Sequence, residues 1–244
     1  MSKSIFALAL VAGAGICASS NAALVAYWNF NGSTTANGTT NTGGNGTLNT
    51  TAPDLGAATM SFSSGLTFNT TTTTTPTGNI GSFGGSTINA LNSDPSGGAL
   101  DITGAPDNKS ASAVTANGQY IQFQFSMLGK ANASFSWAGR GTSTGFGSAG
   151  TPNKLQYSVD GTNFQLLNTY TSTQTSFQLY SYSFGSALDG LANAYIRIVI
   201  DGATGGAGNN RWDNIQINAD AVPAPGSIAL VGLAGLVAGR RRRN

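Results

Sequence analysis

Between residues 119 and 218 the chain alternates apolar and polar residues with a period of two. Ile121, Phe123 and Phe125 are separated by polar residues, and the same spacing recurs in Ala133–Trp137 and Ile196–Ile200. Successive side chains of a strand point to opposite faces, so each segment predicts a β-strand with one dry and one wet face. Such strands are typical of antiparallel sheets, because the strands of parallel sheets are buried on both faces.

Further segments extend this pattern into one domain. Asp160-Gly161 is a hairpin-turn dipeptide. Stretches 31–51 and 69–78 are almost entirely Asn, Gly, Thr and Ser, which predicts long exposed loops because they bury little apolar surface. We therefore expect an all-β fold, an antiparallel two-sheet sandwich, over residues 23–221. The remaining expected strands are Leu24–Phe30, Met60–Phe62, Leu66–Phe68, Leu155–Val159, Phe164–Tyr170, Phe177–Phe184 and Ile215–Ile217.

Residues 1–22 have the three parts of a cleavable signal peptide. Lys3 supplies the positive charge, an apolar run reaches Ile16, and Ser20-Asn21-Ala22 offers a small-x-small cleavage site. The apolar run is shorter than the roughly 20 residues that a spanning helix needs. We expect export through Sec-type machinery and removal of this segment by signal peptidase.

Residues 222–244 form a second segment that is separate from the sandwich. Its prolines predict an extended, exposed piece, because they fix φ and remove backbone donors. The apolar run Gly226–Gly239 would be about 21 Å long as a helix, against about 30 Å for a hydrocarbon core. The arginines after it predict a cytoplasmic end. The short motif before the run is Val222, Pro223, Ala224 and Pro225, and the cluster after it is Arg240, Arg241, Arg242 and Arg243.

This arrangement resembles the PEP-CTERM sorting signal: a Pro-x-Pro motif, a short transmembrane helix and a terminal arginine cluster. The resemblance implies an exosortase partner, transient retention in the inner membrane, and later release to the cell surface or an exopolysaccharide matrix. Residues 222–225 would then be the sorting motif and the four arginines the retention cluster. The usual Glu between the prolines is Ala224 here. The alternative is an ordinary C-terminal membrane anchor.

Composition excludes several classes of function. The chain has no His, and its single cysteine, Cys17, lies in the signal peptide. The exported domain therefore cannot build a Ser-His-Asp triad, a Cys nucleophile or a Cys/His zinc site. Lys3 and the four terminal arginines are five of the eleven basic residues, so six remain against nine acids, a formal charge of −3. This balance predicts no nucleic-acid partner.

Two sets of residues are candidates for binding sites. We expect no cofactor, but oxygen ligands from Asp201, Asp213 and Asn214 could hold a structural calcium ion. The alternative is that Asp213 and Asn214 cap a strand and pair with Arg211 or Arg197. Carbohydrate binding would need exposed aromatic rings that stack on the apolar face of a pyranose. The candidate rings for that role are Trp212, Tyr180, Tyr182 and Tyr195.

The segments 155–164, 196–202 and 211–217 resemble successive strands of extracellular jelly-roll modules. The last, Arg211-Trp212-Asp213-Asn214-Ile215-Gln216-Ile217, has the Asp-Asn-hydrophobic sequence of their closing strand. The resemblance implies the fold and leaves the function open. We expect a non-enzymatic, structural or adhesive protein of the cell surface, extracellular matrix or biofilm. The first alternative is a carbohydrate-binding module for exopolysaccharide, and the second is a hydrolase that uses only Asp.

Overall fold

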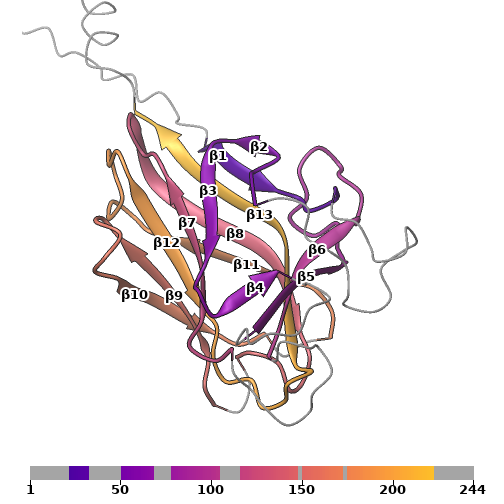
Figure 1. Ribbon diagram of the computed structural model, residues 1–244. Helices are drawn as coiled ribbons and strands as arrows, with labels where there is room; N and C mark the ends of the chain where they lie inside the picture. The colour runs from indigo at the N-terminus through magenta and orange to yellow at the C-terminus, as the bar shows by residue number, and fades with distance from the viewer. Residues whose placement is uncertain are drawn as a thin grey trace, which may run out of the picture.

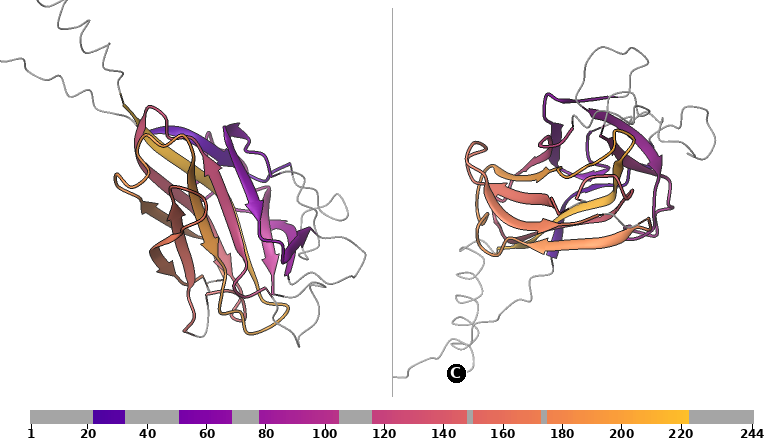
Figure 2. Two further views of the ribbon diagram at one scale, coloured as in Figure 1. Left: turned by 60° about the vertical axis from the view of Figure 1, so that its left-hand side comes forward. Right: turned by 90° about the horizontal axis from the view of Figure 1, so that it is seen from below.

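The chain folds into two β-sheets packed face to face (Figures 1 and 2). The computed structural model describes residues 22–32, 51–68, 78–104, 116–147, 150–172 and 175–222, and within these ranges every regular element is a strand. All but one of the strand pairs found there are antiparallel; β4 and β5 run parallel. The all-β, antiparallel sandwich predicted from the alternation is therefore confirmed.

The larger sheet has eight strands organised around one long strand, β13 (Asn209–Ala221). β8 follows β13 along most of its length, whereas β6 pairs with its first half and β1 with its second half. The other members of this sheet are β1 (Ala22–Trp28), β2 (Leu55–Gly56), β4 (Leu66–Phe68), β5 (Gly78–Gly84), β6 (Gly98–Thr103), β8 (Lys130–Gly141) and β11 (Gln178–Ser183).

The smaller sheet has five strands in the order β10-β9-β12-β7-β3, all antiparallel. Strands far apart in sequence are neighbours here, because β12 lies between β9 and β7. Their bounds are β3 (Ala58–Phe62), β7 (Tyr120–Phe125), β9 (Asn153–Ser158), β10 (Gln165–Tyr170) and β12 (Ala194–Val199).

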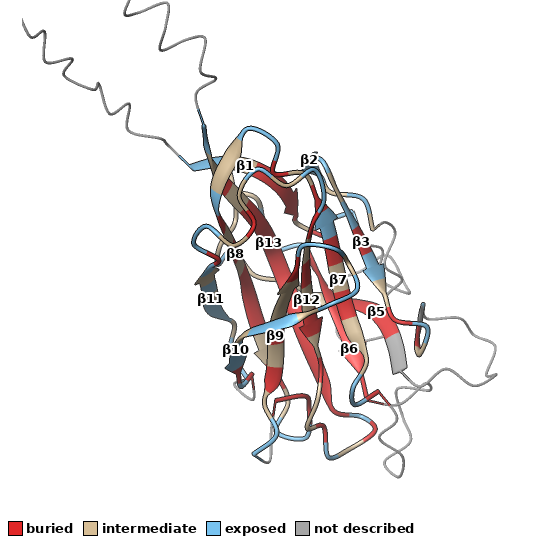
Figure 3. Ribbon diagram, turned by 90° about the vertical axis from the view of Figure 1, so that its left-hand side faces the viewer, coloured by how far each residue is buried: buried red, intermediate tan, exposed pale blue. Residues whose placement is uncertain are grey.

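Aromatic rings join the two sheets across the core, where the central strands are buried (Figure 3). Trp28 contacts Phe123, Phe123 contacts Phe135, and Phe135 contacts Trp137, each with ring centroids 5.0–5.2 Å apart. Tyr180 stacks on Trp137 at 5.2 Å and 13°. Each such contact adds about 0.5–1.5 kcal/mol to the stabilisation from burial alone.

Three strands of the larger sheet, β2, β5 and β6, were not expected from the sequence. β2 has only two residues, and β5 contains Gly81 and Gly84, which weaken a strand pattern. β6 alternates apolar and polar residues only over Leu100–Thr103, and its polar residues Asp101 and Thr103 are buried, so it is not a half-buried strand. The closing strand is also longer than the predicted Ile215–Ile217.

The two ends of the described domain lie side by side, because Ala22 of β1 pairs with Asp220 of β13. β1 begins at Ala22, the residue expected to precede cleavage. The rest of the signal peptide, Pro223 onward, and most of the two loops expected at 31–51 and 69–78 lie outside the described residues. Among the residues described, none forms a helix long and apolar enough to cross a bilayer.

We predict that Gly139→Ala destabilises the protein by about 1–3 kcal/mol, as overpacking of a core does. A Cβ at Gly139 would lie 2.8 Å from the Tyr180 ring and 2.9 Å from Trp137 Nε1, and the stack of these two rings leaves little room to move. Gly32→Ala is the control, because a Cβ there meets nothing within 4 Å. Urea unfolding of both variants checks this; equal midpoints would contradict the packing account.

Candidate functional site

The outer face of the five-stranded sheet presents polar and aromatic side chains in rows that cross the strands. One row follows the register Ser61, Gln122, Arg197, Gln156 and Leu166, with one residue from each strand. The next row on the same face consists of Thr59, Gln124, Tyr195 and Ser158. We call these two rows, with Tyr120 and Phe164 beside them, the outer face.

Arg197 lies at the centre of the outer face and is held on several sides. Its guanidinium carbon is 3.9 Å from the ring centroid of Tyr120 and 3.4 Å from that of Phe164. Tyr120 comes from β7 on one side of β12, and Phe164 comes from the turn after β9 on the other. Nε and Nη2 of Arg197 both donate to Gln122 Oε1, at 3.3 and 2.9 Å. These contacts fix the plane of the guanidinium group.

The turn between β9 and β10 covers one end of the outer face. Gly161 has a φ of 75°, and a Cβ there would lie 2.9 Å from the Tyr195 ring, so the turn packs directly on that ring. Asp160 accepts hydrogen bonds from Thr162 N and Asn163 N, each 2.8 Å long. Bonds from the backbone and side chain of Asn163 hold the pKa of Asp160 well below its usual range. The predicted Asp160-Gly161 hairpin turn is therefore confirmed by the pairing of β9 with β10.

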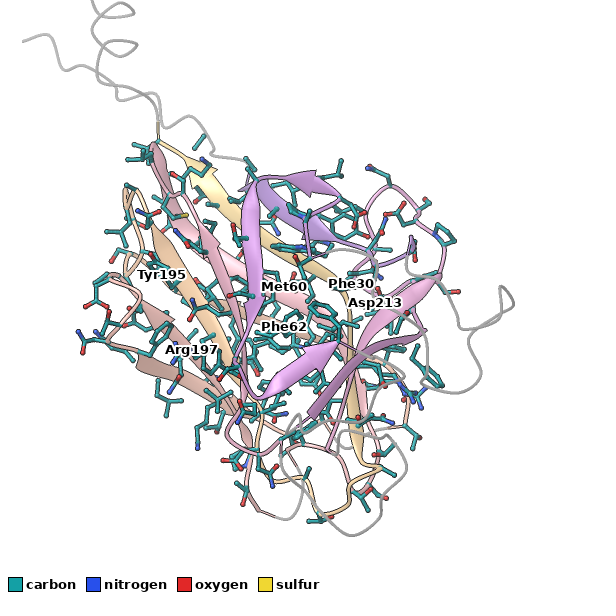
Figure 4. The ribbon with its side chains drawn as sticks, in the orientation of Figure 1. Phe30, Met60, Phe62, Tyr195, Arg197 and Asp213 are labelled. Atoms are coloured by element: carbon teal, nitrogen blue, oxygen red, sulfur yellow. The ribbon has the colours of Figure 1, made fainter. Side chains whose placement is uncertain are left out.

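The four predicted sugar-binding aromatics lie in different places. Tyr195 is on the outer face, beside Arg197 on β12 (Figure 4). Trp212 is only 1 % exposed, and its Nε1 donates to Tyr170 Oη at 3.3 Å, so its prediction as an exposed ring is wrong. Tyr180 and Tyr182 turn inward and stack on Trp137.

Tyr180 nevertheless contributes to a surface groove of about 710 Å³ at the edge of the sandwich. Its hydroxyl donates to Thr171 O at 2.8 Å, which ties β11 to the segment after β10. Burial raises the pKa of Tyr180 to about 12, so the hydroxyl stays protonated at neutral pH. The groove is lined by Gly150, Pro152, Thr169, Tyr170, Thr171, Gln178 and Tyr180.

The residues predicted to bind calcium are not brought together. Asp201 follows β12 and pairs with Lys154 Nζ at 3.3 Å. Asp213 lies within β13, where its carboxylate accepts Ser86 N at 2.6 Å and Asn214 N at 2.8 Å. Within the described ranges, no three acidic, His or Cys side chains are grouped as metal ligands.

The alternative pairing of Asp213 or Asn214 with an arginine is also wrong. Arg211 pairs with Asp101 at 3.0 Å in a buried ion pair, and Arg197 binds Gln122. Asn214 instead anchors the loop that follows β5: its Nδ2 donates to Ser86 O at 2.7 Å and to Ile88 O at 2.9 Å. Asp213 and Asn214 therefore hold a loop onto the sheet.

Several outer-face residues were missed as a site in the sequence. The sequence indicated Gln122 and Gln124 only as polar partners in an alternating strand, and Arg197 only as such a partner or as a partner of Asp213 or Asn214. The signal that could have found them is that the outward positions of β7 and β12 carry the large planar side chains of Gln, Tyr and Arg instead of Ser or Thr. Their grouping depends on the register between non-consecutive strands.

Comparisons with known proteins return likeness in fold only. No family model matches the chain, and no curated protein matches its sequence. The CBM22-1–CBM22-2 tandem domain of Paenibacillus barcinonensis Xyn10C is 11 % identical with a TM-score of 0.45, over 86 % of this chain and 50 % of that one. This chain therefore spans about half of that structure.

Two further solved structures are similar at the same level. The CBM22-1 xylan-binding domain of the same Paenibacillus protein is 10 % identical with a TM-score of 0.41, over 84 % of this chain and 100 % of that one. The K1 cleaved adhesin domain of Lys-gingipain from Porphyromonas gingivalis is 10 % identical with a TM-score of 0.44, over 80 % and 98 %. Because these scores are low, we base function on the residues of this chain alone.

Asp213 generates a prediction about pH. Burial raises its pKa from an ordinary 3.8 to about 8, against the effect of its two N–H donors. The folded protein then binds more protons than the unfolded chain between these two values. Its free energy of unfolding should therefore fall as pH rises through this window, by up to about 1.4 kcal/mol per pH unit. Burial also raises the pKa of Asp101, to about 6. Asp101 therefore adds to the fall in the free energy of unfolding in the lower part of the same pH window.

Urea unfolding at several pH values between about 5 and about 8 measures this slope. Asp213→Asn should flatten the slope of the free energy of unfolding against pH above about pH 6. The chain has no His, so no imidazole contributes to the slope there. Asp160→Asn is the control, because the pKa of Asp160 is lowered and its titration ends at more acid pH. A parent protein that becomes more stable toward pH 8 would show that Asp213 stays ionised when folded.

Proposed function

We propose that the chain is an exported, non-catalytic polysaccharide-binding protein of the cell surface or exopolysaccharide matrix, and that the outer face binds the glycan. The observation that carries this proposal is the grouping of partly exposed rings and planar polar side chains in adjacent rows. Tyr195, Arg197, Gln122 and Gln156 are each of intermediate exposure, so they are supported by the sheet and still reach solvent.

The chemistry of these side chains matches that of a sugar. A ring face stacks on the apolar face of a pyranose, and Tyr195 and Phe164 supply such rings. Sugar hydroxyls both donate and accept hydrogen bonds, as do the amides of Gln122, Gln124 and Gln156. A row across five strands, spaced about 4.8 Å apart, measures about 19 Å, which suits a polysaccharide better than a single sugar.

The placement of the carboxylates supports a non-catalytic role. A glycosidase of the usual kind needs two carboxyl groups that face the substrate. Neither row of the outer face contains an Asp. All eight described Asp side chains accept hydrogen bonds that hold the fold together: Asp54, Asp94, Asp101, Asp160, Asp189, Asp201, Asp213 and Asp220.

The sorting proposal is consistent with the geometry of the domain ends. Val222 is exposed, and its backbone N–H donates to Gly129 O at 2.9 Å directly after β13. The start of β1 and the end of β13 lie at the same pole, because Ala22 pairs with Asp220. Removal of residues 1–22 would take only the first residue, Ala22, from β1, and removal of a tail after Val222 would leave β13 intact. A matrix protein with this domain would link the cell surface to the polysaccharide.

We predict that the purified protein is retained on exopolysaccharide and that Tyr195→Ala weakens binding about tenfold, equivalent to about 1.4 kcal/mol. Affinity electrophoresis measures this, with circular dichroism to confirm folding. The matched control is Gln178→Ala, on exposed β11 in the edge groove. If Gln178→Ala abolishes binding while Tyr195→Ala does not, the glycan lies in the groove and the outer-face assignment is wrong.

We further predict that deletion of residues 223–244 changes the destination of the protein. Without the tail, the exported chain should appear in the soluble fraction and should not be retained in the inner membrane. Fractionation of cells that express the full or the shortened chain measures this. A variant in which Arg240–Arg243 are changed to Ser loses the retention cluster and keeps the prolines. It therefore tests retention in the membrane separately from recognition of the sorting motif. A shortened chain that reaches the surface as the parent does would contradict the sorting proposal.

A further inference from the structure

The outer face carries a single cation, Arg197, that no acidic side chain neutralises. Within the described residues the two ion pairs are Lys154 with Asp201 and Arg211 with Asp101. Arg211 is buried with its partner, so it is not available to a ligand. Lys154 lies on the same side of the sheet as Arg197 and forms an ion pair with Asp201 at 3.3 Å. Arg197 therefore dominates the charge of the outer face.

The guanidinium of Arg197 is organised in advance. The rings of Tyr120 and Phe164 contact it, and Gln122 Oε1 accepts from Nε and Nη2. Within the described part of the chain, Nη1 donates to no protein acceptor, which leaves one edge of the fork for a ligand. Arginine stays protonated throughout the physiological range. Little side-chain entropy is then lost when a ligand binds, because the rotamer is already fixed.

A fixed, planar guanidinium with a free edge recognises a carboxylate. Arginine binds carboxylates through parallel N–H···O bonds, which are about twice as strong as bonds between neutral groups. In the same row, Gln156 and Ser61 flank Arg197 and Gln122 with neutral polar groups. These groups suit sugar hydroxyls. The row as a whole thus combines one carboxylate receptor with several hydroxyl receptors.

We propose that the outer face selects a carboxylated polysaccharide, with the carboxylate of a uronic acid residue bound by Arg197. This inference rests on the proposed function and specifies the class of glycan. Tyr195, in the neighbouring row, supplies the ring for an adjacent sugar. The formal charge of residues 23–221 is −3, but neither row of this face contains an acid. Asp160, which accepts from Ser158 of the second row, is also bound by the backbone of Thr162 and Asn163.

The experiment compares an oligogalacturonide with its carboxyl-reduced, neutral counterpart, by calorimetry on the exported protein. The parent should bind the oligogalacturonide about tenfold more tightly or better, and added salt should weaken only that binding. Arg197→Gln should remove the preference, because it should lower the affinity for the oligogalacturonide about tenfold more than the affinity for the neutral oligomer. Arg197→Lys keeps the charge and loses the planar fork, so it should restore only part of the preference.

The outcomes separate this inference from the proposed function. Equal affinity of the parent for both oligomers, or equal affinity for a sulfated oligomer, would overturn the carboxylate inference. The proposed function would still hold in that case if the binding of these oligomers is weakened by Tyr195→Ala. Failure of the parent to bind any glycan would contradict the proposed function itself. If Arg197→Gln does not fold, the parent protein alone still tests the carboxylate inference. The test is then whether the parent prefers the oligogalacturonide to the neutral oligomer and whether added salt weakens only the binding of the oligogalacturonide.

Discussion

The structure depends on a chain of aromatic contacts that crosses from one sheet to the other. Trp28 on β1 contacts Phe123 on β7, Phe123 contacts Phe135 on β8, and Trp137 contacts Tyr170 on β10 at 5.2 Å. Residues 23–221 contain no cysteine, so no disulfide can hold the two sheets together. The inward packing of these rings also decides which face each of their strands turns to solvent. Because β7 points Phe123 inward, it must point Gln122 and Gln124 outward.

The outer face is therefore a consequence of the core. In β12, Ile196 and Ile198 are fully buried, which places Tyr195 and Arg197 on the opposite side. The alternation in these strands predicted this, and the two-sheet architecture followed from it. What could not be predicted is that Arg197 would lie directly between Gln122 and Gln156. That placement requires β9, β12 and β7 to be neighbours, and a non-local register leaves no local mark in the sequence.

The error on Trp212 has a local physical cause. Ile215 and Ile217 point inward, and strict alternation would place Trp212 on the outside with respect to them. The register of β13 against β8 shifts between Asp213 and Gln216, and Asn214 has a φ of 49°. One residue is thereby added to the strand, which turns Trp212 into the core and Asp213 to the outer side. Asn tolerates this left-handed conformation better than most residues, and its side chain anchors the loop after β5.

A surface with few charges makes a single arginine more selective. Charged residues are only 8 % of the chain, and Arg197 forms no ion pair with a described acid. On a highly charged surface the same guanidinium would pair with a neighbouring carboxylate, as Arg211 does with Asp101. Here its neighbours are Gln122, Tyr120 and Phe164, which orient the group without neutralising it. The positive charge is therefore left for a ligand that brings its own carboxylate.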